Sequence, residues 1–158
     1  MPSVLFVCTA NQYRSPIAAA RFEARLIQEG RPGIWEIASA GTWTTSGAPA
    51  LPLARKLAYN HGVSLDEHMT KLVSKAQLTE FDLVLVMESG HKEALLTEFP
   101  FAAGYLFMLS EVVDGIRYDI RNPTTSYEEA EKCIEDLCEL IERGYEKICT
   151  LAEAICVT

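Results

Sequence analysis

The sequence contains no long apolar run. No stretch of its 158 residues approaches the roughly 18 apolar residues that are needed to span a bilayer. Its first apolar run covers only Val4 to Val7 and follows no basic segment, so the N-terminus lacks the pattern of a secretion signal. These absences predict a cytoplasmic protein without a membrane partner.

Positive charge is also scarce. The chain has 14 Lys and Arg against 22 Asp and Glu, which gives a net charge of -8 at pH 7. Nucleic-acid affinity comes mainly from Lys and Arg that neutralise phosphates, so we expect no nucleic-acid partner. Many of the acidic residues fall between positions 128 and 142, where we expect the solvated face of a helix.

The cysteines show neither a disulfide pattern nor a zinc pattern. Their number, 5, is odd, and no two have C-x2-C spacing. They are Cys8, Cys133, Cys138, Cys149 and Cys156. Three of the four late cysteines lie on or beside the apolar stripe of a helix, which indicates core packing. Cys8 stands apart from them.

Length and composition predict one domain, 1–158, because 49% apolar residues in a chain of this size support a substantial core. Short apolar strands are expected at 3–8, 34–39, 81–87 and 105–109. Helices are expected from Ser15 (as N-cap) to about residue 29, over 50–61 and 89–98, and from Tyr127 onward, with a loop over 110–126. This alternation predicts an α/β fold with a parallel sheet covered on both faces.

The most informative segment runs from Val4 to Pro16. An apolar strand ends at Cys8, a polar loop follows, and Arg14-Ser15-Pro16 opens a helix. In parallel sheets, ligands bind beyond the carboxyl ends of the strands, and a loop that leads into a helix binds phosphate through its N–H groups. C-x5-R spacing alone is weak evidence for an anion site. The order of strand, polar loop, arginine and helix start favours an anion site over a buried structural cysteine.

The expected roles follow from charge. Cys8 lies where its thiolate is stabilised, and Arg14 can hold two phosphate oxygens with a planar fork that Lys cannot copy. Ser15 can donate a hydrogen bond to the thiolate, and Asn11 can pin the loop. The predicted residues for binding inorganic phosphate or another oxyanion are Thr9, Ala10, Asn11, Gln12, Tyr13, Arg14 and Ser15.

Residues 8–16 closely resemble the C-x5-R-S-P loop of the low-molecular-weight protein tyrosine phosphatases. The segments Ser39–Trp43 and Asp82–Glu88 are similar to later segments of that family, in the same order. The resemblance implies a three-layer α/β fold, flavodoxin-like or Rossmann-like, with a four-stranded parallel sheet flanked by helices.

The same resemblance implies a mechanism. Cys8 would be the nucleophile that forms a phosphocysteine, and Arg14 would stabilise the transferring phosphoryl group, with no metal and no cofactor. Trp43 would help to wall the pocket. The substrate would be a phosphorylated protein, and a tyrosine kinase is one candidate because bacterial members of the family often oppose such kinases.

The sequence departs from the family at the general acid. The family carries Asp-Pro late in the chain, whereas this chain has Asn122-Pro123, and an amide does not exchange protons at neutral pH. Positioned acid–base catalysis is typically worth about 10²–10⁴-fold. Three interpretations stay open: a slow phosphatase, an acid supplied by Asp119 after a loop shift, or a phosphoprotein-binding module, natural or made by an introduced Asn.

Other departures concern the substrate. Thr124 and Thr125 follow the proline where tyrosine phosphatases of the family often carry aromatic residues, and polar Gln12 occupies a position that lines the pocket mouth. Phosphotyrosine is favoured, and phosphoarginine is a live alternative. Arsenate reduction is disfavoured because no cysteine lies between Cys8 and Cys133. The histidines, His61, His68 and His91, are expected at surface or loop positions without a catalytic role.

Overall fold

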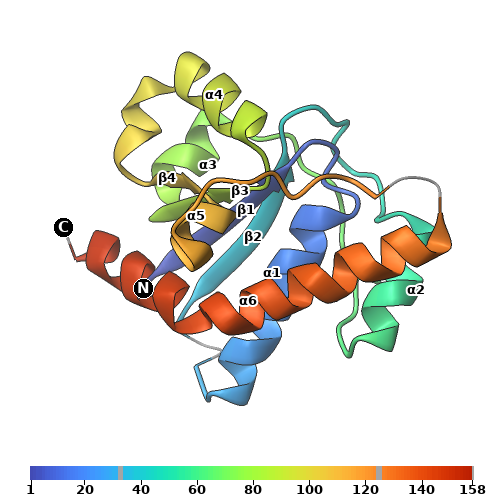
Figure 1. Ribbon diagram of the computed structural model, residues 1–158. Coiled ribbons are helices and arrows are strands. Elements are labelled where there is room, and N and C mark those ends of the chain that lie inside the picture. The colour runs from blue at the N-terminus through green and yellow to red at the C-terminus, as the bar shows by residue number, and fades with distance from the viewer. Residues whose placement is uncertain (32–33, 124–125, 158) are drawn as a thin grey trace.

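The computed structural model describes residues 1–31, 34–123 and 126–157. Its centre is a parallel sheet of four strands in the order β2-β1-β3-β4 (Figure 1). The strands are β1 (Ser3–Cys8), β2 (Glu36–Gly41), β3 (Leu83–Val86) and β4 (Leu106–Met108). This confirms the predicted parallel α/β sheet and places β1, which ends in Cys8, between two neighbours.

Helices cover both faces of the sheet. They are α1 (Arg14–Gln28), α2 (Pro52–Asn60), α3 (Lys75–Glu80), α4 (Ser89–Glu98), the 3-10 helix η1 (Pro100–Gly104), α5 (Leu109–Asp114) and α6 (Tyr127–Cys156). Figure 1 shows α1 and α6 on one side of the sheet and α3 and α4 on the other. The arrangement is the three-layer α/β fold that the sequence predicts.

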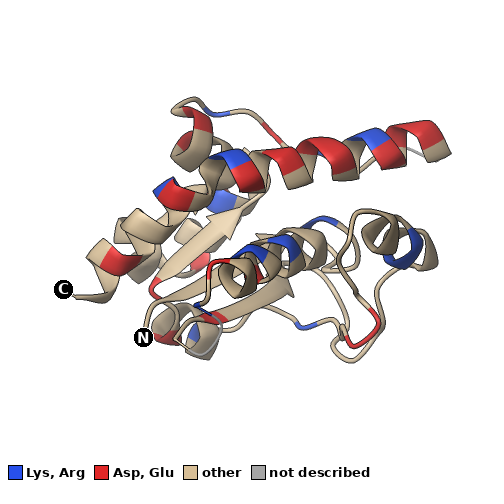
Figure 2. Cartoon of the chain, turned by 90° about the horizontal axis from the view of Figure 1, so that it is seen from below, with Lys and Arg blue, Asp and Glu red and all other residues tan. Residues whose placement is uncertain are grey.

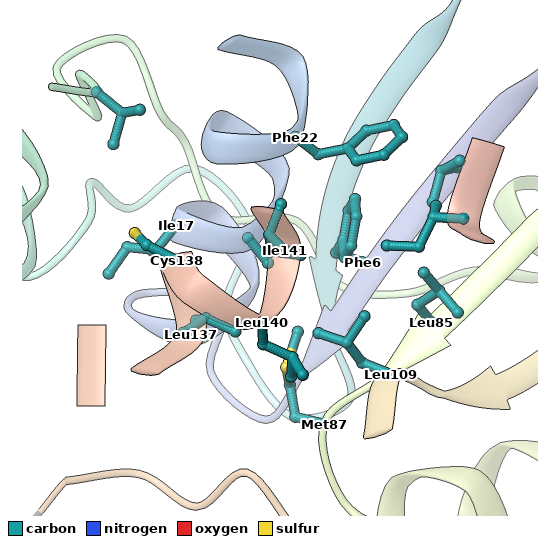
Figure 3. Packing of buried hydrophobic residues seen from close by; sticks show 14 of the residues in the cluster. Phe6, Ile17, Phe22, Leu85, Met87, Leu109, Leu137, Cys138, Leu140 and Ile141 are labelled. Atoms are coloured by element: carbon teal, nitrogen blue, oxygen red, sulfur yellow. The ribbon is translucent and has the colours of Figure 1, made fainter. Parts of the chain in front are cut away.

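Alternate residues of β1 supply the two cores. Val4 and Phe6 pack with residues of α1 and α6, whereas Leu5 and Val7 pack with residues of α3 and α4. Figure 3 shows Phe6 beside Phe22 of α1, and the ring centroids of these two residues are 5.8 Å apart. Because β1 is buried on both faces, its sequence is a continuous apolar run rather than an alternating one.

Helix α6 confirms the prediction of a long amphipathic helix from Tyr127. Acidic residues recur along its length (Figure 2). The predicted solvated face is confirmed from 128 to 139, where the acidic side chains are exposed, whereas Glu142 is half-buried and pairs with Arg21 and Arg25 of α1. Among the described residues, no helix is both long enough and apolar enough to cross a membrane.

Two local predictions are wrong. Ser15 is not the N-cap of α1, because the helix already begins at Arg14 and the Ser15 hydroxyl is used inside the fold instead. The expected loop 110–126 contains most of α5, and the Asp114-Gly115 turn signal marks the end of that helix, with Gly115 at φ 74° as its left-handed cap. Helices α3 and η1 were not expected from the sequence, and the strands begin or end up to two residues away from their predicted limits.

Candidate active site

The loop from Thr9 to Tyr13 joins the carboxyl end of β1 to the start of α1. Cys8 is 2% exposed, and both Asn11 and Arg14 are buried although they are polar. Burial of an arginine is costly unless its donors are paired or have an anionic partner. The loop therefore holds polar groups at the position where parallel sheets bind ligands.

Two donors face the sulfur of Cys8. The Asn11 N–H donates to Sγ at 3.3 Å, and Ser15 Oγ lies 3.0 Å from Sγ. Because Asn11 Nδ2 donates to Ser15 Oγ at 2.8 Å, the serine oxygen is an acceptor there and keeps its own hydrogen for Cys8 or for the Ala40 carbonyl, 3.3 Å away. This arrangement places hydrogen-bond donors beside the sulfur.

Asn11 is the centre of the loop. It has a left-handed backbone, with φ 58°, a conformation that asparagine tolerates better than most residues. Its side chain donates to Ser39 Oγ at 2.9 Å and accepts the Lys71 N–H at 2.9 Å. His68 Nε2 lies 2.7 Å from the backbone carbonyl oxygen of Asn11. Asn11 thus ties the loop to β2 and to the segment around residue 70.

Gly41 allows the loop to pack closely against β2. It pairs with Cys8 in the register of β1 and β2, and a Cβ there would lie 2.5 Å from the Thr9 carbonyl oxygen and 3.1 Å from Asn11 N. Those neighbours are backbone atoms of the loop, which cannot rotate away. A side chain at this position would displace the loop residues beside Cys8.

Gly41→Ala is therefore expected to destabilise the fold by about 1–3 kcal/mol, the usual cost of overpacking, and to weaken phosphate binding. Urea unfolding and calorimetric titration with inorganic phosphate measure the two effects. Gly90→Ala is the matched control, because its added Cβ meets no atom within 4 Å. Equal phosphate affinity in Gly41→Ala and wild type would refute this account of the loop.

Arg14 is hydrogen-bonded from three directions, but not through its Nε. Its NH1 donates to Glu88 Oε2 at 2.6 Å and to the Ile120 carbonyl at 2.7 Å, and its NH2 donates to Thr9 Oγ1 at 3.3 Å. Its Nε is buried with no hydrogen-bond partner. A bound oxyanion is the partner that this orphaned, charged donor requires.

The backbone of the loop offers further donors. In the described part of the chain, the N–H groups of Ala10, Gln12 and Tyr13 donate to no protein acceptor. Together with Arg14 Nε they supply the positive field that an anion needs beside Cys8. Among the described residues, no group of three or more His, Cys, Asp or Glu side chains is placed to hold a metal ion.

A cavity of about 240 Å³ opens onto Cys8. Its lining is Cys8, Ala10, Gln12, Tyr13, Leu51, Leu53, Asn122, Pro123 and Ala130. Leu51 and Leu53, at the start of α2, were not expected in this lining. Trp43, the expected wall, is not part of this lining: it is 83% exposed, and its backbone N–H donates to the Thr9 carbonyl at 3.0 Å. Thr124 and Thr125 lie outside the described residues.

At the position where the family carries its general acid, the side chain that lines the cavity is the amide of Asn122. Pro123 also lines the cavity. Asp119 does not: its Oδ1 accepts the Ser89 N–H at 2.8 Å, its Oδ2 lies 3.6 Å from Arg121, and it lines a neighbouring groove against α6. Asp119 could reach the reaction only after its bond to Ser89 breaks.

Tyr13 fastens the loop to α6. Its buried hydroxyl donates to the Ala130 carbonyl in the first turn of that helix. Burial, with smaller contributions from Cys133 and Cys138, raises the pKa of this hydroxyl far above its ordinary value. Tyr13 therefore stays neutral and serves as a structural donor at the wall of the cavity.

The expectation that the histidines lie at surface or loop positions is wrong for His91, which is part of α4. His91 is buried, and its Nε2 lies 2.8 Å from Thr9 Oγ1. His68 contacts Asn11, while His61 is half-buried at the end of α2. The structure shows reciprocal capping contacts between Glu88 and His91, but Glu-x-x-His is not the usual Ser/Thr-x-x-Glu/Gln signature, so the sequence contained no signal for His91.

A thiol and a guanidinium lie at one loop in which three N–H groups have no acceptor among the described residues. This arrangement is typical of α/β proteins that bind an oxyanion beside a cysteine. Over residues 3–155 the sequence matches the family described as "Low molecular weight phosphotyrosine protein phosphatase". The chain belongs to this family.

Its relatives include two kinds of protein phosphatase. It is 32% identical to "Probable low molecular weight protein-tyrosine-phosphatase EpsP" of Ralstonia nicotianae, over 90% of each chain. It is 34% identical to "Protein-arginine-phosphatase" of Geobacillus stearothermophilus, over 93% of this chain and 96% of that protein. The crystal structure of a YwlE mutant from Bacillus subtilis superposes with a TM-score of 0.87 at 27% identity, covering 94% of this chain and 99% of that one.

Proposed function

We propose that this protein hydrolyses phosphotyrosine in phosphorylated proteins through a phosphocysteine on Cys8. The observation that carries the proposal is the buried Arg14, whose Nε lacks a protein partner in the loop that holds Cys8. Membership of a phosphatase family supports phosphoprotein substrates. The proposed mechanism requires Cys8 in its reduced state, and the proposed cytoplasmic location keeps thiols reduced. A tyrosine kinase is one candidate among the substrates.

The proposed reaction has two steps. The Cys8 thiolate attacks phosphorus, a sulfur–phosphorus bond forms, and the bond from phosphorus to the tyrosine oxygen breaks. Water then attacks the phosphocysteine, which releases inorganic phosphate and restores the thiolate. Arg14 and the N–H groups of the loop stabilise the equatorial oxygens in both steps.

Asn122 determines which leaving groups can depart. It cannot donate a proton, so the tyrosine oxygen leaves as a phenolate. A phenol has a pKa of about 10, so its anion leaves far more readily than an alkoxide. Aryl esters are therefore the substrates on which this site can work without a general acid.

The lining of the cavity favours phosphotyrosine over phosphoarginine. Leu51, Leu53 and Pro123 offer apolar contact to an aromatic ring. A guanidinium would require a carboxylate, and the described lining of the Cys8 cavity contains none. The relatives include both kinds of phosphatase, so the preference depends on this chain's own residues.

Binding without turnover is the second candidate function, and Asn122 in the lining is the observation that favours it. The test measures turnover of p-nitrophenyl phosphate, a phosphotyrosine peptide and a phosphoarginine peptide by wild type, Cys8→Ser and the surface control Cys156→Ser. We expect turnover of the two aryl esters, lost only in Cys8→Ser. Tight peptide binding without turnover would identify a binding module, and activity that survives in Cys8→Ser would refute the mechanism.

A further inference from the structure

The hydroxyl of Thr9 lies between the guanidinium of Arg14 and a buried histidine. Thr9 Oγ1 is 3.3 Å from Arg14 NH2 and 2.8 Å from His91 Nε2. His91 belongs to α4, on the face of the sheet opposite to α1, and is 7% exposed. A polar contact therefore runs from α4 through the loop to the arginine that faces the anion.

The tautomer of His91 follows from its second nitrogen. Nδ1 lies 3.1 Å from the backbone nitrogen of Glu88. A backbone N–H can only donate, so Nδ1 accepts and carries no proton in the neutral ring. Nε2 then bears the hydrogen and donates to Thr9 Oγ1. The threonine oxygen accepts from both Nε2 and Arg14 NH2, which fixes its position.

From this geometry we propose that His91 is a positioning residue: through the Thr9 hydroxyl it sets the plane of the Arg14 guanidinium for the phosphoryl group. NH1 is held by Glu88 and Ile120, and a planar group held at one nitrogen can still turn about that point. The bond from NH2 to Thr9 supplies the second point. The inference rests on the phosphate site proposed above.

The charges around His91 are consistent with a neutral ring. Arg14 of α1, Glu88 at the N-terminus of α4 and Asp119 of the loop before α6 face it. Burial first, and then Arg14, lower the pKa of His91 against the opposite effect of the two carboxylates. A neutral His91 donates to Thr9 without competing with Arg14 for the Glu88 carboxylate, whose Oε2 lies 3.8 Å from Nε2.

The experiment measures sulfate binding by calorimetry in a Cys8→Ser background. Sulfate is a stable dianion of the shape of phosphate, and the background removes the charge of the nucleophile. Thr9→Val keeps the volume of the side chain but loses the hydroxyl, whereas Thr9→Ser keeps the hydroxyl. His91→Phe keeps a ring without nitrogens, and His61→Phe is the matched control, because His61 lies at the end of α2 and, among the described residues, makes no hydrogen bond to the loop.

We expect Thr9→Val and His91→Phe each to weaken sulfate binding about three- to tenfold, the range for one lost hydrogen bond, whereas Thr9→Ser binds sulfate more tightly than Thr9→Val and His61→Phe leaves the affinity unchanged. Thr9→Val combined with His91→Phe should bind no more weakly than the weaker single variant, because both remove the same chain of contacts. Rescue by serine would not arise if Thr9 acted only through packing.

Three results would overturn the inference: full affinity in Thr9→Val, equal losses in Thr9→Val and Thr9→Ser, or additive losses in the double variant. If His91→Phe fails to fold, full affinity in Thr9→Val would still overturn the inference. No sulfate binding by the Cys8→Ser protein itself would instead overturn the proposed phosphate site, and thereby the basis of this inference.

Discussion

Asn122→Asp is expected to raise kcat for a phosphotyrosine peptide by about 10²–10⁴-fold, the usual contribution of a positioned acid. Asn122 lines the cavity that contains Cys8, and aspartate has nearly the same size. The new carboxyl group would protonate the leaving oxygen in the first step and take a proton from water in the second. The gain should be smaller for p-nitrophenyl phosphate, whose leaving group needs little protonation.

Steady-state kinetics on both substrates test this prediction, with Asn60→Asp as the control at an exposed position at the end of α2. An unchanged rate in Asn122→Asp would show that the amide position is not where the acid acts. If Asp119→Asn then abolished turnover, Asp119 would be the acid after release from Ser89. If the double variant Asn122→Asp/Cys8→Ser lacks the increased kcat of Asn122→Asp, the new carboxyl group and Cys8 act in one mechanism.

The sequence predicted those site residues that lie close together both along the chain and in space. Cys8, Asn11 and Arg14 lie within a single turn between a strand and a helix, so residue order alone brings them together. The long helix α6 was equally predictable from the sequence, because its apolar residues repeat with the helical period. Both predictions depended on local spacing.

Contacts made by the sheet could not be inferred in this way. Val7 of β1 pairs with Val86 of β3, which brings the Glu88–His91 capping box beside Thr9 although more than 70 residues separate them in sequence. No spacing rule links those positions. The same holds for Leu51 and Leu53, apolar residues of an ordinary loop and helix start whose place in the cavity depends on how α2 packs.

Arg14→Lys is expected to lower kcat/KM by about 10²–10³-fold, the cost of removing one preorganised donor from an oxyanion site. A lysine ammonium is a compact charge and cannot bond Glu88, the Ile120 carbonyl and Thr9 while also presenting a donor in place of Nε. The positive charge is kept, so this variant separates geometry from charge. Arg55→Lys, in a largely exposed pair with Asp66, is the matched control and should leave kcat/KM unchanged.

The effect should appear in transition-state binding more than in folding. Inhibition by inorganic phosphate reports binding of the anion, while kcat reports the charge that develops during transfer, so the two losses can be compared directly. If Arg14→Lys kept full kcat/KM, charge alone would suffice, and the orphaned Nε would have no role in the site. A loss in Arg14→Lys that Glu88→Gln reproduces in part would instead show that the carboxylate behind the arginine, as well as the Thr9 hydroxyl, holds the fork in place.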